Sequence, residues 1–287
     1  MAKTSRKYAT GAGRRGRGDV STWPVPDVIG LTVPLPAAAR RLCLLSNGSY
    51  SVMLSDSGAG FSRWRDLATT RCREDATRDQ WGSHLLLRDS TAAWCGRPTT
   101  RQPLGAKARD VTVTFAQGGA EFVRHEGSLT STLHVAVAPD ADIELRRVTL
   151  TNHGDTFRAL SLTPYPELVL GAVAADNAHS AFSKMFVQTA WEAQHGGLLA
   201  TRRKRAKGET EMWAAQALQV EGVNSESGQK KGALEHETDR ARFLGRRRTL
   251  NDVQAMQPGA SLRALVRPLS SEQVVRCIPP SWFPALQ

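Results

Sequence analysis

Short runs of residues with strand character recur along most of this 287-residue chain, and turn-forming residues separate each run from the next. The separating groups are rich in Asn, Gly, Asp and Pro, as at residues 46–48 and 152–155. The strand-like runs are residues 50–54, 85–87, 111–115, 129–137, 143–151, 159–163, 185–189 and 213–220. Since no long stretch has the apolar spacing of a helix, this pattern predicts a mainly β protein built from antiparallel sheets stacked as a large sandwich.

The stretch LTSTLHVAVAPDADIELRRVTLTNHGD, residues 129–155, gives the clearest single hairpin. It contains one strand, a Pro-Asp turn and a second strand that ends at an Asn-His-Gly-Asp corner. Along the first strand, alternation places Leu133, Val135 and Val137 on one face. We expect that face to be buried between two sheets.

The two ends of the chain differ in composition from this middle part. Residues 1–41 are rich in Gly, Pro and Arg, contain eight basic side chains against two acidic ones, and lack an apolar period. Such a segment buries too little surface to offset its ordering entropy, so we predict a disordered basic arm. The whole chain is 40% hydrophobic, which is enough for a sizeable core. We assign that core to a sandwich domain at residues 42–256, followed by an irregular tail at residues 257–287.

Four cysteines, Cys43, Cys72, Cys95 and Cys277, are too widely spaced for a zinc site or a compact disulfide framework. We therefore expect reduced thiols, no metal and no bound cofactor, and a cytoplasmic location. No run of about 20 uncharged apolar residues occurs, which argues against a membrane span in this chain.

Residues 61–82, FSRWRDLATTRCREDATRDQWG, contain five arginines, four acidic residues and two tryptophans. Arginine forks donate paired hydrogen bonds to neighbouring hydroxyls, carboxylates accept from hydroxyls, and tryptophan faces stack on sugar rings. Such a cluster suits the rim of a sugar-binding cleft. The alternative is a lattice of ion pairs that pins a long loop to the sandwich, with Trp64 and Trp81 as buried anchors. For most of the charged residues in this stretch, the lattice is the expected role.

Five separated blocks of the sequence follow the order of a known family. They are residues 47–82, 146–155 (RRVTLTNHGD), 178–189 (AHSAFSKMFVQT), 198–205 (LLATRRKR) and 237–250 (ETDRARFLGRRRTL). Together they resemble the glycoside phosphorylases of glycoside hydrolase family 94, in particular its cyclic β-1,2-glucan synthase branch. The resemblance covers about residues 43–252, and the tail after about Met256 no longer resembles the family.

The resemblance implies a super-sandwich of the galactose-mutarotase-like kind that leans on a following (α/α) barrel. In the family, an aspartic acid of the barrel protonates the leaving oxygen of a β-glucoside while inorganic phosphate, the co-substrate, attacks the anomeric carbon. This chain ends at Gln287, where the barrel should begin. We therefore expect it to bind a β-glucan oligosaccharide but to be inactive alone. The resemblance also implies a homodimer paired through the sandwiches, and association with a membrane if the chain is part of a full-length synthase.

The family's most recognisable loop, G-[YF]-S-x-[WY]-R-D, matches residues 60–66 of this chain. The resemblance implies that Arg65 and Asp66 face the cleft, and that Lys184, in the block at residues 178–189, reaches the acceptor subsite. The predicted substrate-binding residues are Arg63, Trp64, Arg65, Asp66, Arg73 and Lys184, and no catalytic or metal-binding residue is predicted.

The chain departs from the family pattern at Ser49, Phe61 and Cys72, where an arginine, a tyrosine and a tryptophan are usual. It therefore lacks a tyrosine hydroxyl and an indole that the family's cleft usually has. Glu167, in PYPELVL, has no second acid at a spacing suited to glycoside cleavage. We expect it to be a buried, hydrogen-bonded carboxylate rather than a catalytic one.

Two other functions are compatible with the sequence. A nucleic-acid-binding role would use the basic clusters at residues 202–207 and 240–248 and the arm, because the isoelectric point near 10.1 favours attraction to phosphate backbones. Both clusters lie inside the family blocks and have few aromatic residues around them, so no dedicated nucleic-acid partner is expected. The remaining alternative is a structural interaction module that binds another chain or a second copy.

Overall fold

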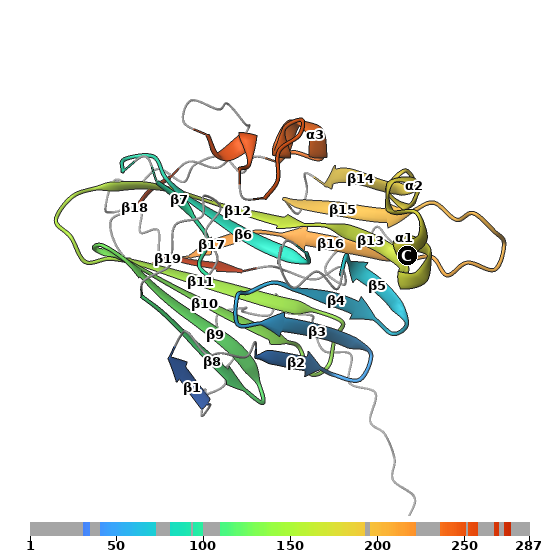
Figure 1. Ribbon diagram of the computed structural model, residues 1–287, viewed down its shortest axis with the longest axis horizontal. Coiled ribbons are helices and arrows are strands. Elements are labelled where there is room, and N and C mark those ends of the chain that lie inside the picture. The colour runs from blue at the N-terminus through green and yellow to red at the C-terminus, as the bar shows by residue number, and fades with distance from the viewer. Residues whose placement is uncertain are drawn as a thin grey trace, which may run out of the picture.

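The computed structural model describes several stretches of the chain, and within them the fold is almost entirely β (Figure 1). The described residues are 31–34, 41–72, 81–92, 94–99, 110–192, 196–221, 236–250, 252–257, 267–269 and 273–276. Every strand pair within these ranges is antiparallel. The prediction of a mainly β protein made of stacked antiparallel sheets is confirmed.

One layer is a seven-stranded sheet, and the predicted hairpin lies at its centre. In order across the sheet, the strands are β1 (Leu31–Pro34), β8 (Val111–Ala116), β9 (Gly119–Glu126), β10 (Leu129–Val137), β11 (Glu144–Asn152), β19 (Gln273–Arg276) and β17 (Gln219–Glu221). β10 pairs with β11 so that Leu133 lies opposite Val148. On β10, Leu133 and Val135 are buried and Val137 packs against the same core, so the predicted buried face is confirmed.

The opposing layer consists of two sheets, and a third small sheet lies beside β13 (Figure 1). The five-stranded sheet has the order β13 (Leu168–Ala172), β5 (Leu67–Thr70), β4 (Gly60–Trp64), β3 (Tyr50–Ser55) and β2 (Leu42–Ser46). The four-stranded sheet has the order β18 (Arg267–Leu269), β12 (Arg158–Pro166), β6 (Ser83–Asp89) and β7 (Trp94–Gly96). The small sheet has the order β14 (Val187–Glu192), β15 (Gly197–Arg202) and β16 (Trp213–Ala217).

The main apolar core fills the space between the seven-stranded sheet and the opposing layer. Phe122 and Val148 enter it from the first layer, and Val52 and Leu54 enter it from the second. Each of these side chains is almost completely buried, as expected where two sheets pack face to face.

β6 is buried on both faces, which explains why it reads as a continuous run of leucines. Leu85 and Leu87 belong to the main core, whereas Leu86 points to a second apolar cluster. That cluster is formed by the short helix α3 (Arg240–Leu244) and a 3₁₀ turn at Gln254–Met256. Figure 1 shows both elements on the outer side of β6 and β12.

Two further short helices, α1 (Val173–Ala178) and α2 (Ser180–Lys184), follow directly after β13 and lead to β14. β13 itself is irregular, because its pairing with β5 shifts between Leu168 and Gly171. Leu170, within this bulge, is buried with a φ of 52°. The bulge turns the chain out of the five-stranded sheet and toward the small one.

Three short strands lie in segments that were predicted to be an arm or a tail. β1 pairs with β8, β18 pairs with β12, and β19 lies between β11 and β17. These strands have three or four residues each, which is too few for side-chain alternation to be recognised in a sequence. Residues 31–34, 267–269 and 273–276 thus form strands within these segments, and the bounds of the arm, domain and tail stay predictions.

The charged stretch at residues 61–82 begins as a hairpin rather than as a long loop. β4 and β5 pair closely, and only Arg65 and Asp66 connect them. Arg65 has a φ of 51°, a backbone region that favours glycine. β4 has the sequence GFSRW, in which small, aromatic and charged residues follow one another without a clear apolar alternation, although Ser62 is buried. Residues 73–80 lie outside the described residues.

Candidate functional site

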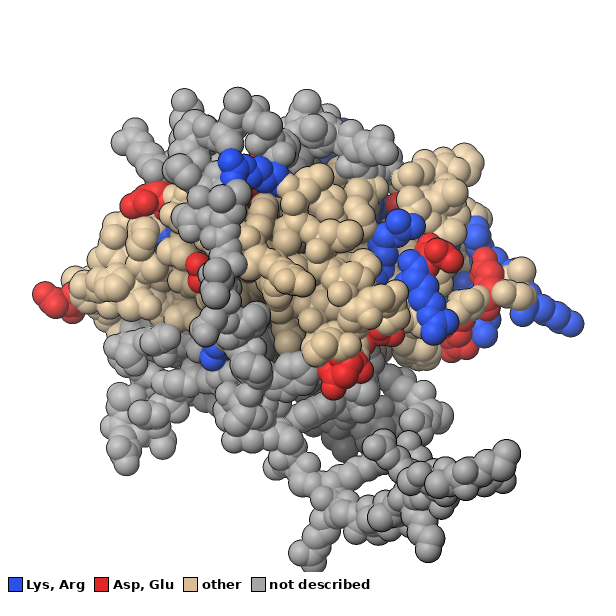
Figure 2. Space-filling view, turned by 90° about the horizontal axis from the view of Figure 1, so that it is seen from below, with Lys and Arg blue, Asp and Glu red and all other residues tan. Residues whose placement is uncertain are grey.

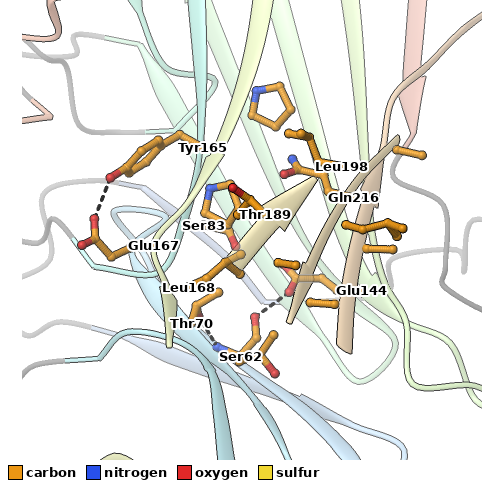
Figure 3. A pocket seen from close by; sticks show the side chains of 18 of the residues that line it. Ser62, Thr70, Ser83, Glu144, Tyr165, Glu167, Leu168, Thr189, Leu198 and Gln216 are labelled. Carbon is orange, nitrogen blue, oxygen red and sulfur yellow. Dashed lines mark hydrogen bonds between the residues drawn. The ribbon is translucent and has the colours of Figure 1, made fainter. Parts of the chain in front are cut away.

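A cleft of about 810 Å³ opens where the three sheets of the opposing side meet. Its walls come from the inner face of β4 and β5, the end of β12, the face of β15 and β16, and the turn that precedes β11. Figure 3 shows how these elements bring Ser62, Glu144, Glu167, Leu198 and Gln216 around one space. The cleft is thus built from segments that are far apart in the sequence.

Glu144 is the acceptor for a group of polar side chains in one wall. Ser62 Oγ donates a hydrogen bond of 2.6 Å to Glu144 Oε2, and Tyr50 OH donates one of 3.3 Å to the same atom (Figure 3 shows the first). Arg146 Nε lies 2.5 Å from Glu144 Oε1 and completes the group. Burial, followed by the charge of Glu144, raises the pKa of Tyr50 well above its usual value, so this hydroxyl stays protonated.

Glu167 is the centre of a second polar group in the opposite wall. Its side chain is 5% exposed and accepts from Arg71 Nη1 at 2.8 Å and from Tyr165 OH at 2.6 Å. Lys184 Nζ lies 2.5 Å from Glu167 Oε1, and Arg240 Nε lies 3.4 Å from it. The prediction that Glu167 is a buried, hydrogen-bonded carboxylate is confirmed.

The surroundings of Glu167 fix its protonation state. Burial alone would raise the pKa of Glu167, but hydrogen bonds from Lys184 and Tyr165 and the charges of Lys184 and Arg240 outweigh it and lower the pKa to about 2. Glu167 is therefore ionised at neutral pH. Burial, followed by the charge of Glu167, raises the pKa of Tyr165, which remains a donor.

Arg71 anchors this group from behind and is itself 2% exposed. Its Nε and Nη2 donate to the two carboxylate oxygens of Asp176, at 2.7 and 2.6 Å, while Nη1 donates to Glu167. Arg71 belongs to the stretch at residues 61–82 in which a lattice of ion pairs was predicted, and it does form ion pairs, with acids from outside that stretch. Its partners flank β13, with Glu167 just before it and Asp176 in α1 after it, and the pairing of β13 with β5 brings both next to Arg71.

Three tryptophans line the cleft, and polar or ring contacts orient each of them. Trp64 Nε1 donates to Asp142 Oδ2 at 2.6 Å, and Trp213 Nε1 donates to Glu211 Oε1 at 3.0 Å. The Trp191 ring stacks on His236 with 4.2 Å between the centroids and an interplanar angle of 5°. Asp142 also accepts from Ser49 Oγ, which is the position where the family usually has an arginine.

The predicted binding residues fall into two groups by location. Trp64 and Lys184 line the cleft. Arg65 and Asp66 are exposed in the β4–β5 turn, where Arg65 Cζ lies 4.7 Å from the Trp64 ring centroid. Arg63, Arg65 and Asp66 do not line the cleft. Arg73 lies outside the described residues.

Several cleft residues were not singled out from the sequence. Tyr50, Ser62, Glu144 and Arg146 meet only because the turn before β11 folds onto β3 and β4. Glu144 and Ser62 are 82 positions apart. No local sequence motif indicates that these residues lie close together. Arg146 is part of a family block, residues 146–155, but nothing in that block points to Glu144 or Ser62.

The basic clusters that favoured a nucleic-acid role are interspersed with acids in the described part of the chain. Arg205 pairs with Glu209, Lys204 with Glu211, and Arg248 with Asp252. Figure 2 shows positive and negative side chains side by side at the end of the molecule where the β15–β16 hairpin projects. Such mixing lowers the local positive potential that binds phosphate backbones.

Within the described ranges, no three His, Cys, Asp or Glu side chains come together as metal ligands would. None of the helices described here has the length and apolar character needed to cross a bilayer.

Comparison with known proteins gives two findings. A family model, "Glycosyl hydrolase 94, supersandwich domain", matches residues 30–274. The match begins before and ends after the blocks at 43–252, so the expectation that the tail no longer resembles the family is wrong as far as residue 274. Cyclic beta-(1,2)-glucan synthase NdvB of Rhizobium meliloti (strain 1021) is 40% identical over 225 residues, or 78% of this chain. The matched region is 8% of that protein's length.

Proposed function

Because the chain belongs to the supersandwich domains of glycosyl hydrolase family 94, we propose that its cleft binds a short segment of a β-glucan chain. The chain is a domain related to glucan synthases and phosphorylases. The relative from Rhizobium meliloti, which matches 78% of this chain, is named for β-(1,2)-glucan. A β-1,2-linked glucose oligosaccharide is therefore the first ligand to test.

The observation that carries this proposal is the composition of the cleft walls. Oriented indole faces of Trp64, Trp191 and Trp213 suit the apolar faces of glucose rings, while Thr189 and Gln216, which line the same space, can hydrogen-bond ring hydroxyls. The volume of about 810 Å³ lies within the range of small-molecule sites, roughly 300–1,000 Å³, and suits a short oligosaccharide.

The two wall carboxylates support binding rather than catalysis by this chain. A general acid must hold a proton near neutral pH, which requires a raised pKa. The pKa of Glu167 is lowered to about 2. Glu144 accepts from two hydroxyls and pairs with Arg146. We propose that a barrel outside the described fold supplies the proton donor and uses inorganic phosphate, so that this chain alone is inactive. We also propose that the sandwich pairs as a homodimer.

A calorimetric titration tests the binding proposal. We expect β-1,2-linked oligosaccharides to bind, and the affinity to survive high salt, because stacking and hydroxyl contacts are weakly screened. Trp213, 43% exposed, should matter for binding but not for folding. Trp213→Ala should lower the affinity about fivefold to tenfold. Phe157→Ala, which truncates an exposed ring away from the cleft, serves as the control.

Two results would contradict the proposal. One is equal affinity in Trp213→Ala and wild-type protein, which would place the ligand elsewhere. The other is binding of nucleic acid, but not glucan, that collapses as salt is raised. A separate incubation with β-1,2-glucan and phosphate should yield no glucose 1-phosphate, and its formation would overturn the claim that the chain is inactive alone.

A further inference from the structure

Lys184 and Arg240 both project into the cleft and converge on one carboxylate oxygen. Lys184 Nζ lies 2.5 Å and Arg240 Nε lies 3.4 Å from Glu167 Oε1. Their side chains remain 34% and 53% exposed, and both residues line the cleft. Two cations that contact the same atom are close enough to hold one ligand group between them.

Glu167 has little capacity left to satisfy these two cations. Arg71 Nη1 already donates to Oε1 and Tyr165 OH donates to Oε2. Arg71 is neutralised by its two-point pairing with Asp176. One buried carboxylate charge therefore faces two cations at the wall of the cleft, and one positive charge remains uncompensated in this group.

The other acids near Arg240 are turned toward backbone donors. Asp239 Oδ1 accepts from the amides of Ala241 and Arg242, and Asp239 Oδ2 lies 3.8 Å from Arg242 Nε. Glu237 Oε1 accepts from the Asp239 amide. The side chains of Glu237 and Asp239 are thus engaged at the start of α3, and neither contacts the guanidinium of Arg240.

From this geometry we propose that Lys184 and Arg240 form an anion subsite, which takes a phosphate monoester or carboxylate carried by the saccharide in the cleft. The inference rests on the proposed function, since it assumes a saccharide ligand. An ammonium group has three N–H donors and a guanidinium has five, so both side chains have donors beyond their contacts with Glu167 and Tyr165. Hydrogen bonds from such donors to a charged oxygen are about twice as strong as those between neutral groups.

The test compares glucose 6-phosphate, inorganic phosphate and glucose by calorimetry, with wild-type protein and two variants. Arg240→Gln removes one cation of the subsite, and Arg242→Gln removes a neighbouring cation, 76% exposed, that does not line the cleft. We expect wild-type protein to bind glucose 6-phosphate more tightly than glucose. Arg240→Gln should lose about tenfold in affinity for the phosphate ester, whereas Arg242→Gln should lose almost none.

A second variant keeps the test independent of one side chain. Lys184→Gln should also lower the affinity for glucose 6-phosphate, while thermal unfolding checks that it remains folded. Equal affinities for glucose 6-phosphate and glucose, or equal losses in Arg240→Gln and Arg242→Gln, would overturn the subsite. Tight binding of inorganic phosphate that matches the ester and depends on Arg240 would assign the subsite to free phosphate instead of a substituted saccharide, and would overturn the saccharide part.

The neutral β-1,2-linked oligosaccharide separates this inference from the proposed function. If it binds in the cleft and the phosphate ester gains nothing, only the anion subsite fails. If the ester binds through Arg240 while the neutral oligosaccharide does not bind, the proposed function fails and the anion subsite remains.

Discussion

Arg65 and Arg71 lie close together in one charged stretch but have opposite surroundings. Arg65 is exposed in a turn with a φ of 51°, whereas Arg71 is 2% exposed and holds two carboxylates. Removing one member of a buried ion pair leaves an uncompensated charge. We therefore expect Arg71→Ala to lower the free energy of unfolding by about 3–5 kcal/mol, measured by urea denaturation.

Arg65→Gly is the matched variant, and it should behave in the opposite way. Glycine relieves the strain of a positive φ, so stability should stay within about 1 kcal/mol of wild type or rise. Similar losses in both variants would contradict the assignment of Arg71 as a buried anchor and Arg65 as an exposed turn residue.

The lowered pKa of Glu167 makes the stability of the protein depend on pH. Its pKa is about 2 in the folded protein and about 4.5 when unfolded, so the unfolded state binds the proton more readily. Its contribution, on the order of 3 kcal/mol, is present above about pH 4.5 and is lost as the pH falls toward 2. The difference in stability between wild type and Glu167→Gln should therefore shrink on acidification. A difference that stays constant from pH 6 to pH 3 would contradict this reading.

At the scale of elements, two glycines allow the charged stretch to close against the sandwich. A Cβ on Gly82 would lie 2.2 Å from Gly60 O, and Gly82 has a φ of 100°. We expect Gly82→Ala to lower stability by about 2–5 kcal/mol, from backbone strain together with the steric clash. The Gly82 carbonyl also accepts from the Glu167 amide, so the clash would reach the cleft wall.

Gly48→Ala separates the backbone strain of Gly82→Ala from its steric clash. Gly48 has a φ of 98°, but no atom lies within 4 Å of an added Cβ. It should lose only the conformational part, about 1–2 kcal/mol. Equal losses by thermal unfolding would show that close approach to Gly60 adds nothing.

Alternation predicted the long strands because one face of each is buried. β10 was predicted with its bounds and its buried face, and β6 was recognised as a leucine run. Alternation did not predict the β4–β5 hairpin, whose short strands GFSRW and LATT show no clear apolar alternation, or strands of three or four residues. The run at 213–220 proved to be two strands, β16 and β17, in different sheets. Only Leu218 separates them, so the sequence has no turn-forming residue that would mark the break.

The site was harder to predict from the sequence than the fold was. Trp64 and Lys184 line the cleft, but the carboxylates that hold the walls together, Glu144 and Asp176, had no local signal. Asp176 meets Arg71 across 105 positions. Such meetings depend on how the sheets pack, and their residues become recognisable only once the pairing of β13 with β5 is known.

At the scale of the whole molecule, the cleft exists because three sheets meet at one place. The main core fixes the opposing layers, and the small β14–β16 sheet closes the side next to β13. The five-stranded sheet contributes Trp64 to the walls, the four-stranded sheet contributes Tyr165, and the small sheet contributes Trp191 and Trp213. The cleft proposed to bind a glucan therefore depends on the assembled sandwich and not on any single motif of the sequence.

The most direct test of the glucan cleft is a ¹H–¹⁵N spectrum of the tryptophan indoles, recorded while a β-1,2-linked oligosaccharide is added. The chain has seven tryptophans, and among those whose side chains the structure describes, Trp64, Trp191 and Trp213 line the cleft. We predict that these three indole signals shift together with one dissociation constant while that of Trp81, which does not line the cleft, stays in place. A spectrum without shifts, or with shifts confined to the other tryptophans, would contradict the account.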